Sequence, residues 1–116
     1  MKERPEIPII RREEEIELHP GKIVYVEGTY EQEDVRMVQE SPKTLILGHV
    51  VVVLEDGCRV FLYPPGRDEA LRSKEEIRQF EHKKVSVLGR IYPTIPQDGT
   101  IQIAPCLEDI QSIEMV

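Results

Sequence analysis

The sequence contains no tryptophan, two phenylalanines and four tyrosines among its 116 residues. Its only two cysteines, Cys58 and Cys106, lie far apart and match no metal-binding spacing, so we expect buried thiols rather than a zinc site. The longest apolar run, residues 50–54, is far shorter than the roughly 20 residues that a membrane helix needs. The sequence therefore predicts neither a metal centre nor a membrane-spanning segment.

Recognisable catalytic patterns are also missing. His19, His49 and His82 are scattered along the chain, without an H-x-x-x-H or C-x-x-C spacing. No glycine-rich phosphate loop is present, and no serine lies in a nucleophile elbow. We therefore predict that the protein is not an enzyme and needs no cofactor.

Positive charge is in short supply. The chain has 22 acidic and 15 basic residues, giving a formal net charge of −7. This balance argues against tight non-specific binding to a phosphate backbone, although a local basic patch would still create its own field. The N-terminal residues are acidic and contain proline, with no apolar segment typical of a secretory signal, which predicts a cytoplasmic location.

Residues 1–15 have the composition of a flexible arm. Two prolines disfavour helix there, and the run Glu13–Glu15 is typical of a solvated segment. We therefore predict that residues 1 to about 12 lack regular secondary structure and that the folded domain spans residues 16–116. Ile7, Ile9 and Ile10 are apolar exceptions, and a second possibility is that they fold over the outer face of the hairpin expected at residues 48–63.

Two later segments, residues 22–30 and 84–92, have strand composition with a glycine inside each. Ser73 followed by Glu76 forms a capping-box pattern, which predicts a helix within residues 73–82. Residues 100–104 alternate like a short final strand.

The segment from residue 48 to 63 is typical of a β-hairpin that is apolar on both faces. Asp56-Gly57 predicts a two-residue turn, which places Val53 opposite Val60. In that register Val51, Val53, Val60 and Leu62 point inward. The outward face then carries Arg59, Phe61, Tyr63, Val50, Val52 and Leu54. The reverse assignment, with Phe61 in the core, stays open.

The order of these elements resembles the OB-fold, a five-stranded Greek-key barrel with a helix between strands three and four. The segments that carry this resemblance are GKIVYVEG, LEDGCRVFL, SKEEIRQFEHKKVSVLGRI and TIQIAPCLEDI, which cover most of residues 21–113. The pattern is similar to that of small stand-alone OB proteins of bacteria. It implies an all-β, five-stranded OB-like barrel with one short helix.

The resemblance also implies a place for a ligand. OB-folds that bind single strands use the second and third strands, where aromatic side chains stack on bases. The candidate ligand-binding residues are therefore Arg59, Phe61, Tyr63, Val50 and Val52. Two functions stay open: a non-catalytic module for single-stranded nucleic acid, and a module for protein–protein interaction or self-association through the same apolar face, as a homo-oligomer in the latter case.

Overall fold

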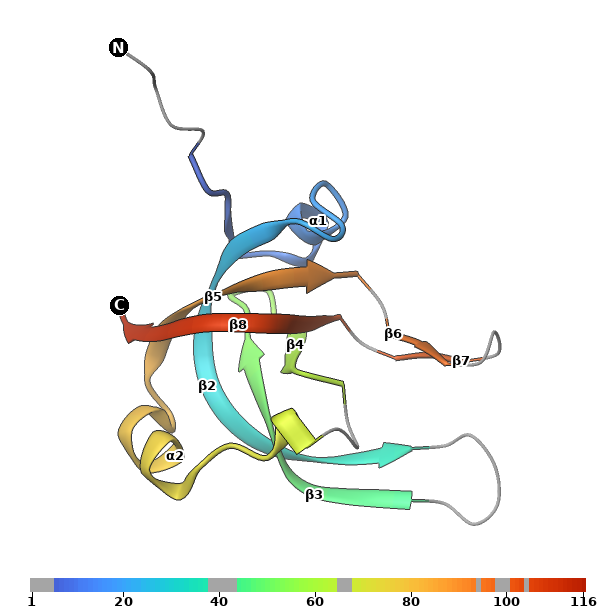
Figure 1. Cartoon of the computed structure of the whole chain (residues 1–116), viewed down its shortest axis with the longest axis vertical. Helices are drawn as coiled ribbons and strands as arrows, with labels where there is room; N and C mark the ends of the chain where they lie inside the picture. Colours follow the sequence, from blue (N-terminus) through green and yellow to red (C-terminus); the bar gives the residue numbers. More distant parts are fainter. Residues whose placement is uncertain (1–5, 38–43, 65–67, 94, 98–100, 104) are drawn as a thin grey trace.

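The computed structural model describes residues 6–37, 44–64, 68–93, 95–97, 101–103 and 105–116. These residues form mainly β-structure, with a six-stranded sheet and a separate two-stranded one (Figure 1). The large sheet contains β1 (Ile9–Ile10), β2 (Ile23–Met37), β3 (Thr44–Val53), β4 (Arg59–Leu62), β5 (Lys84–Tyr92) and β8 (Cys106–Met115). The small sheet and the helical segments are β6 (Ile95–Gln97), β7 (Ile101–Ile103), α1 (Glu13–Ile16), α2 (Lys74–Phe80) and the 3₁₀ turn η1 (Asp68–Ala70).

Five strands of the large sheet form a ring. The order is β2–β3–β4–β8–β5, and β5 pairs back with β2. The β4–β8 pairing is parallel and the other four are antiparallel. The predicted β-rich class is therefore confirmed, as is a helix between the third and fourth ring strands in chain order, because α2 lies between β4 and β5. The expectation of a single helix is wrong, because α1 is a second one; at four residues it is too short to show a helical period. Within the described ranges, no helix is both long and apolar enough to cross a membrane.

Both mid-strand glycines lie where the sheet bends. A Cβ atom at Gly28 would lie 2.4 Å from the carbonyl oxygen of Val53, so only glycine allows β2 and β3 to approach this closely. Gly89 lies where the register of β5 against β8 shifts. The bend lets β2 pair with β5 in its first half and with β3 in its second half.

The closing strand is not the predicted one. Residues 101–103 pair with β6 in the small sheet, whereas β8 completes the ring. Asp109 has a φ of 52°, and the β5–β8 register shifts beside it. This bulge spaces Leu107, Ile110 and Ile113 three residues apart, which conceals the period of two that marks a strand.

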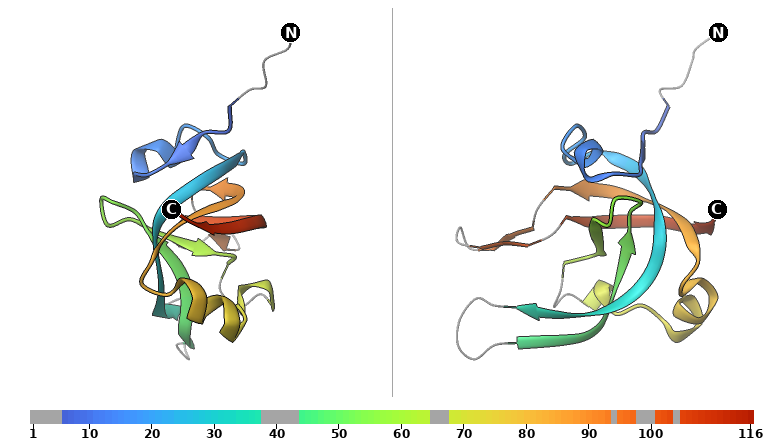
Figure 2. Two further views of the ribbon diagram at one scale, coloured as in Figure 1. Left: turned by 90° about the vertical axis from the view of Figure 1, so that its left-hand side faces the viewer. Right: turned by 180° about the vertical axis from the view of Figure 1, so that it is seen from behind.

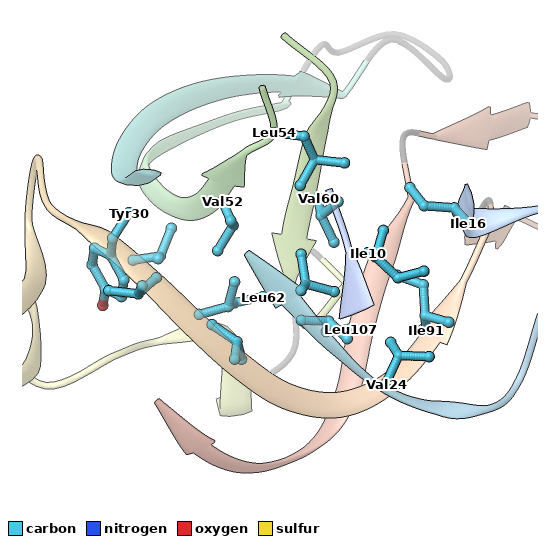
Figure 3. Close-up of a cluster of buried hydrophobic side chains, with 14 of the residues drawn as sticks. Ile10, Ile16, Val24, Tyr30, Val52, Leu54, Val60, Leu62, Ile91 and Leu107 are labelled. Carbon is cyan, nitrogen blue, oxygen red and sulfur yellow. The ribbon is translucent and has the colours of Figure 1, made fainter. Parts of the chain in front are cut away.

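The main core fills the ring from one end to the other (Figure 3). Ile10 and Ile16 lie at the end near α1, and Tyr30 and Phe80 at the end near α2; Figure 2 shows the two helices at these opposite ends. The expectation of an unstructured arm is wrong from Ile9 onward, because β1 pairs with β2 and the Ile10 and Ile16 side chains are buried. A two-residue strand beside prolines is too short to show a periodic pattern.

Candidate binding surfaces

The β3–β4 hairpin has a different register from the predicted one. Val53 pairs with Arg59 and Val52 with Val60, so the turn is one residue longer than expected. The amide of Leu54 donates to the carbonyl of Cys58 at 2.8 Å, and Gly57 has a φ of 89°. A three-residue turn that ends in a left-handed glycine is a common alternative to the two-residue form.

A slip of one residue exchanges the faces of one strand relative to the other. Val50 and Val52 therefore lie in the main core, together with Leu54, Val60 and Leu62. The outward assignment of Val50, Val52 and Leu54 is therefore wrong. Val51 and Val53, which were expected in the core, lie on the other face. The inward assignment of Val60 and Leu62 is confirmed.

The outer face of the hairpin is covered by the chain itself. Val51, Phe61 and Cys106 form a second, smaller buried cluster, and Val53 and Tyr92 pack against it. The ring of His49 lies 5.1 Å from that of Phe61, centre to centre. Phe61 is only 7% exposed, so it offers no open stacking surface. The sequence did not predict Tyr92 and Cys106 in this cluster, because their strands β5 and β8 come to lie beside the hairpin only through the pairing of β8 with β4.

Tyr63 does not continue the row that Phe61 begins. Its φ of 66° interrupts the alternation of the strand, and its hydroxyl accepts a hydrogen bond of 3.0 Å from the amide of Ile110. The guanidinium of Arg72 lies 5.8 Å from the centre of the Tyr63 ring. Arg59, the third member of the predicted row, forms an ion pair with Glu33. The three residues therefore do not form one platform.

A first surface hollow, of about 480 Å³, lies over β2 and the end of β3. Its carboxylates have partners within the described structure: Arg11 binds Glu27 at 2.9 Å, and the ring of His82 lies 2.7 Å from Glu31. The Arg59–Glu33 pair lies in the same hollow. The carboxylates of this hollow are therefore already paired, whereas Lys84, which also lines it, forms no ion pair with a described residue.

A second hollow, of about 600 Å³, separates the start of the hairpin from η1 and α2. We call it the β3–α2 groove. It is lined by Gln32, Gly48, His49, Val50, Ala70, Leu71, Arg72, Lys74, Ile77, Arg78 and Glu81. Three of these residues are cationic and one is a carboxylate. No sequence pattern pointed to this groove, because its residues come from distant segments and none forms a motif.

One wall of the groove is fixed by a hydrogen-bonded triad. Arg72 donates two bonds of 2.8 Å to the carboxylate of Glu76, which also accepts one of 2.6 Å from the Tyr30 hydroxyl. Burial alone would raise the pKa of Glu76, but the bonds from Arg72 and Tyr30 outweigh it and hold that pKa below its usual value. Ser73 caps α2 by accepting from the Glu76 amide, as predicted, while the Glu76 carboxylate is committed to the triad.

The described side chains form no cluster of three metal-binding groups. Cys58 and Cys106 do not form a disulfide, and burial raises the pKa of Cys58 to about 11, which keeps it protonated at neutral pH. Burial also lowers the pKa of His49, which favours its neutral form. These groups are consistent with structural roles.

Comparison of the chain with protein-family models, with curated proteins and with solved structures gives no match.

Proposed function

We propose that the chain is a non-catalytic binding module of OB-like Greek-key topology, and that its ligand is a protein segment. The OB-like part of this proposal is supported by the five-stranded ring and by the position of α2 between β4 and β5, the third and fourth ring strands in chain order. Fold alone does not give function, so the ligand class is argued from the surface.

The observation that carries the choice of ligand is the burial of Phe61. Single-strand binding in OB-folds depends on exposed aromatic rings that stack on bases. Here Phe61 packs in the second cluster and Tyr63 bonds to Ile110. Glu31 and Glu33 lie beside this face and already pair with His82 and Arg59, so these two partners are not available to phosphates. A peptide requires neither stacking nor phosphate contacts.

Single-stranded nucleic acid remains the second candidate, favoured by the cations of the β3–α2 groove. Lys74 and Arg78 are exposed there and form no ion pair with a described residue. They could contact phosphates if a strand crossed α2 rather than the hairpin.

Selection from a displayed random-peptide library on the immobilised protein tests the proposed function. Enriched peptides, resynthesised and labelled, should bind with a measurable dissociation constant. A labelled oligothymidine should bind more weakly in the same low-salt buffer, which favours electrostatic attachment. Failure to enrich any peptide, combined with tight oligothymidine binding, would overturn the protein-ligand proposal in favour of the nucleic-acid one.

A further inference from the structure

The β3–α2 groove combines positive charge with an apolar floor. Val50 and Ala70 are buried beneath it and Ile77 is partly buried. Leu71 also lies in the lining and is 80% exposed, so its side chain is accessible to a ligand in the groove. An apolar group from a ligand could therefore find contacts here that water does not provide.

The helix α2 separates its charges between two sides. Lys74 and Arg78 are four residues apart, so they lie on the same side, and both line the β3–α2 groove. Glu75 and Gln79 are also four residues apart and line a different hollow, against β8. The spacing concentrates cations at the groove although the whole chain carries a net charge of −7.

Two of the three groove cations, Lys74 and Arg78, differ from most arginines that the structure describes, which contact carboxylates. Arg11, Arg12, Arg59 and Arg90 each contact a carboxylate. Lys74 and Arg78 contact none among the residues that the structure describes, while Arg72 beside them is held in place by Glu76. The one carboxylate of the lining, Glu81, lies 3.7 Å from the ring of His82. The groove therefore offers a fixed cation and two available ones.

We propose that the β3–α2 groove binds an acidic peptide segment that carries an apolar side chain. Carboxylates of the ligand pair with Lys74 and Arg78, and its apolar side chain packs against Leu71 and Ile77. This inference rests on the proposed protein-binding function and adds the site and the chemistry of the partner. Charge complementarity supplies the choice of partner, since the rest of the acidic chain would disfavour such a ligand elsewhere.

A nucleic acid fits this groove less well than an acidic peptide. Among the described residues that line it, none is a phenylalanine, tyrosine or tryptophan on which a base could stack, and His49 is buried against Phe61. Two available cations would release few counterions from a polyanion, so they would add little affinity for a nucleic acid. An apolar floor is useful to a peptide but not to a phosphate backbone.

The test uses the full chain and a fluorescein-labelled peptide of glutamates with two central leucines. Fluorescence anisotropy should show binding that weakens about tenfold or more in the double variant Lys74→Glu/Arg78→Glu, because attraction becomes repulsion. The matched control is Lys22→Glu/Lys84→Glu, which changes the net charge equally at exposed sites outside the groove. It should lose about threefold or less, a long-range effect that salt screens.

A second pair of measurements tests the apolar contact. Replacing the two leucines of the peptide with glycine should weaken binding, and Leu71→Ser should weaken binding of the leucine peptide by about three- to tenfold. In Leu71→Ser the glycine peptide should bind as it does to the parent. Amide chemical shifts in a labelled sample should move at residues 70–78. Circular dichroism checks that each variant keeps its fold.

Three outcomes would overturn the inference. One is an equal loss of affinity in the two double-charge variants; another is a set of shifts confined to other strands. The third is displacement of the peptide by oligothymidine at lower concentration, which would assign the groove to nucleic acid. If library selection yields peptides that are not acidic, the proposed function stands and this inference fails. If no peptide of any kind binds, both fail.

Discussion

The two ends of the ring are closed in different ways. At the α1 end, Ile10 and Ile16 enter the core, and two ion pairs lie outside them, Arg11 with Glu27 and Arg12 with Glu55. At the α2 end, Phe80 covers the core and the polar Tyr30–Glu76–Arg72 triad is partly buried beside it. The α1 end therefore has apolar side chains inside and ion pairs on its surface, whereas at the α2 end the charged network is itself partly buried.

This difference separates a structural surface from an available one. Around α1, Arg12 pairs with Glu55 and the amide of Glu13 donates to Asp56 at 2.9 Å, so the charges hold the segment against the hairpin turn. Around α2, Glu76 is used internally, and Lys74 and Arg78 are left exposed without a described partner. Charged side chains that already have a partner stabilise the fold, whereas exposed charges without a described partner remain available to a ligand.

The largest expected effect is at the apolar end. Ile10→Ala should lower the free energy of unfolding by about 2–5 kcal/mol, because it leaves a cavity in a fully buried position. Urea unfolding measures this loss. Ile7→Ala is the matched control, since Ile7 is 39% exposed and its truncation should cost about 1 kcal/mol or less. Equal losses of unfolding free energy in the two variants would show that burial of Ile10 does not stabilise this end of the core.

At the other end, Tyr30→Phe should cost about 1–3 kcal/mol of unfolding free energy. The change removes a hydroxyl that donates to a charged carboxylate and leaves Glu76 with one partner fewer. Tyr25→Phe provides the control, because Tyr25 is half-buried and its hydroxyl bonds to no described residue. Similar stability of the two variants would contradict a stabilising role for the triad.

The triad also predicts a dependence on pH. The pKa of Glu76 is lower in the fold than in the unfolded chain, so its contribution to stability is present above the unfolded value and is lost as pH falls through the folded one. Unfolding measured between neutral and strongly acidic pH should show a smaller acid-dependent loss in Glu76→Gln than in the parent protein. Glu75→Gln, an exposed change on the same helix, should retain the parental loss.

The smallest effect concerns the exposed ion pair at the α1 end. Arg12→Ala should lower the unfolding free energy by about 1 kcal/mol or less, because both side chains of the Arg12–Glu55 pair are about half exposed. Added salt should bring the parent and the variant closer together in thermal melts. A loss as large as that of Ile10→Ala would mean that the ionic contacts, rather than the isoleucines, close this end.

Much of the fold could be predicted from local signals. Ser73 caps α2 as its pattern predicted, and the two glycine-containing segments predicted as strands lie in β2 and β5, with Gly28 at a close approach of two strands and Gly89 at a register shift. Each of these roles depends on a few neighbouring residues and on backbone geometry, which a sequence pattern can reveal.

The predicted binding row failed for the opposite reason. Whether Val52 or Val53 points inward depends on one extra residue in the turn at Gly57, and Asp-Gly fits both turn lengths. The groove residues Leu71, Lys74 and Arg78 meet β3 only after the ring closes. Contacts between distant segments leave no spacing in the sequence that could have identified them.

The parallel β4–β8 pairing has a consequence for how the ring opens. In the part of the chain that the structure describes, two residue pairs join these strands, Phe61 with Cys106 and Leu62 with Leu107, compared with seven between β2 and β5. Two flanking backbone bonds of 2.8 Å, from Phe61 to Pro105 and from Tyr63 to Leu107, belong to the same short contact. Separating β4 from β8 would convert the ring into an open sheet while both ends stay closed. Amide hydrogens here should exchange with solvent through this local opening, well before those of β2, which require global unfolding.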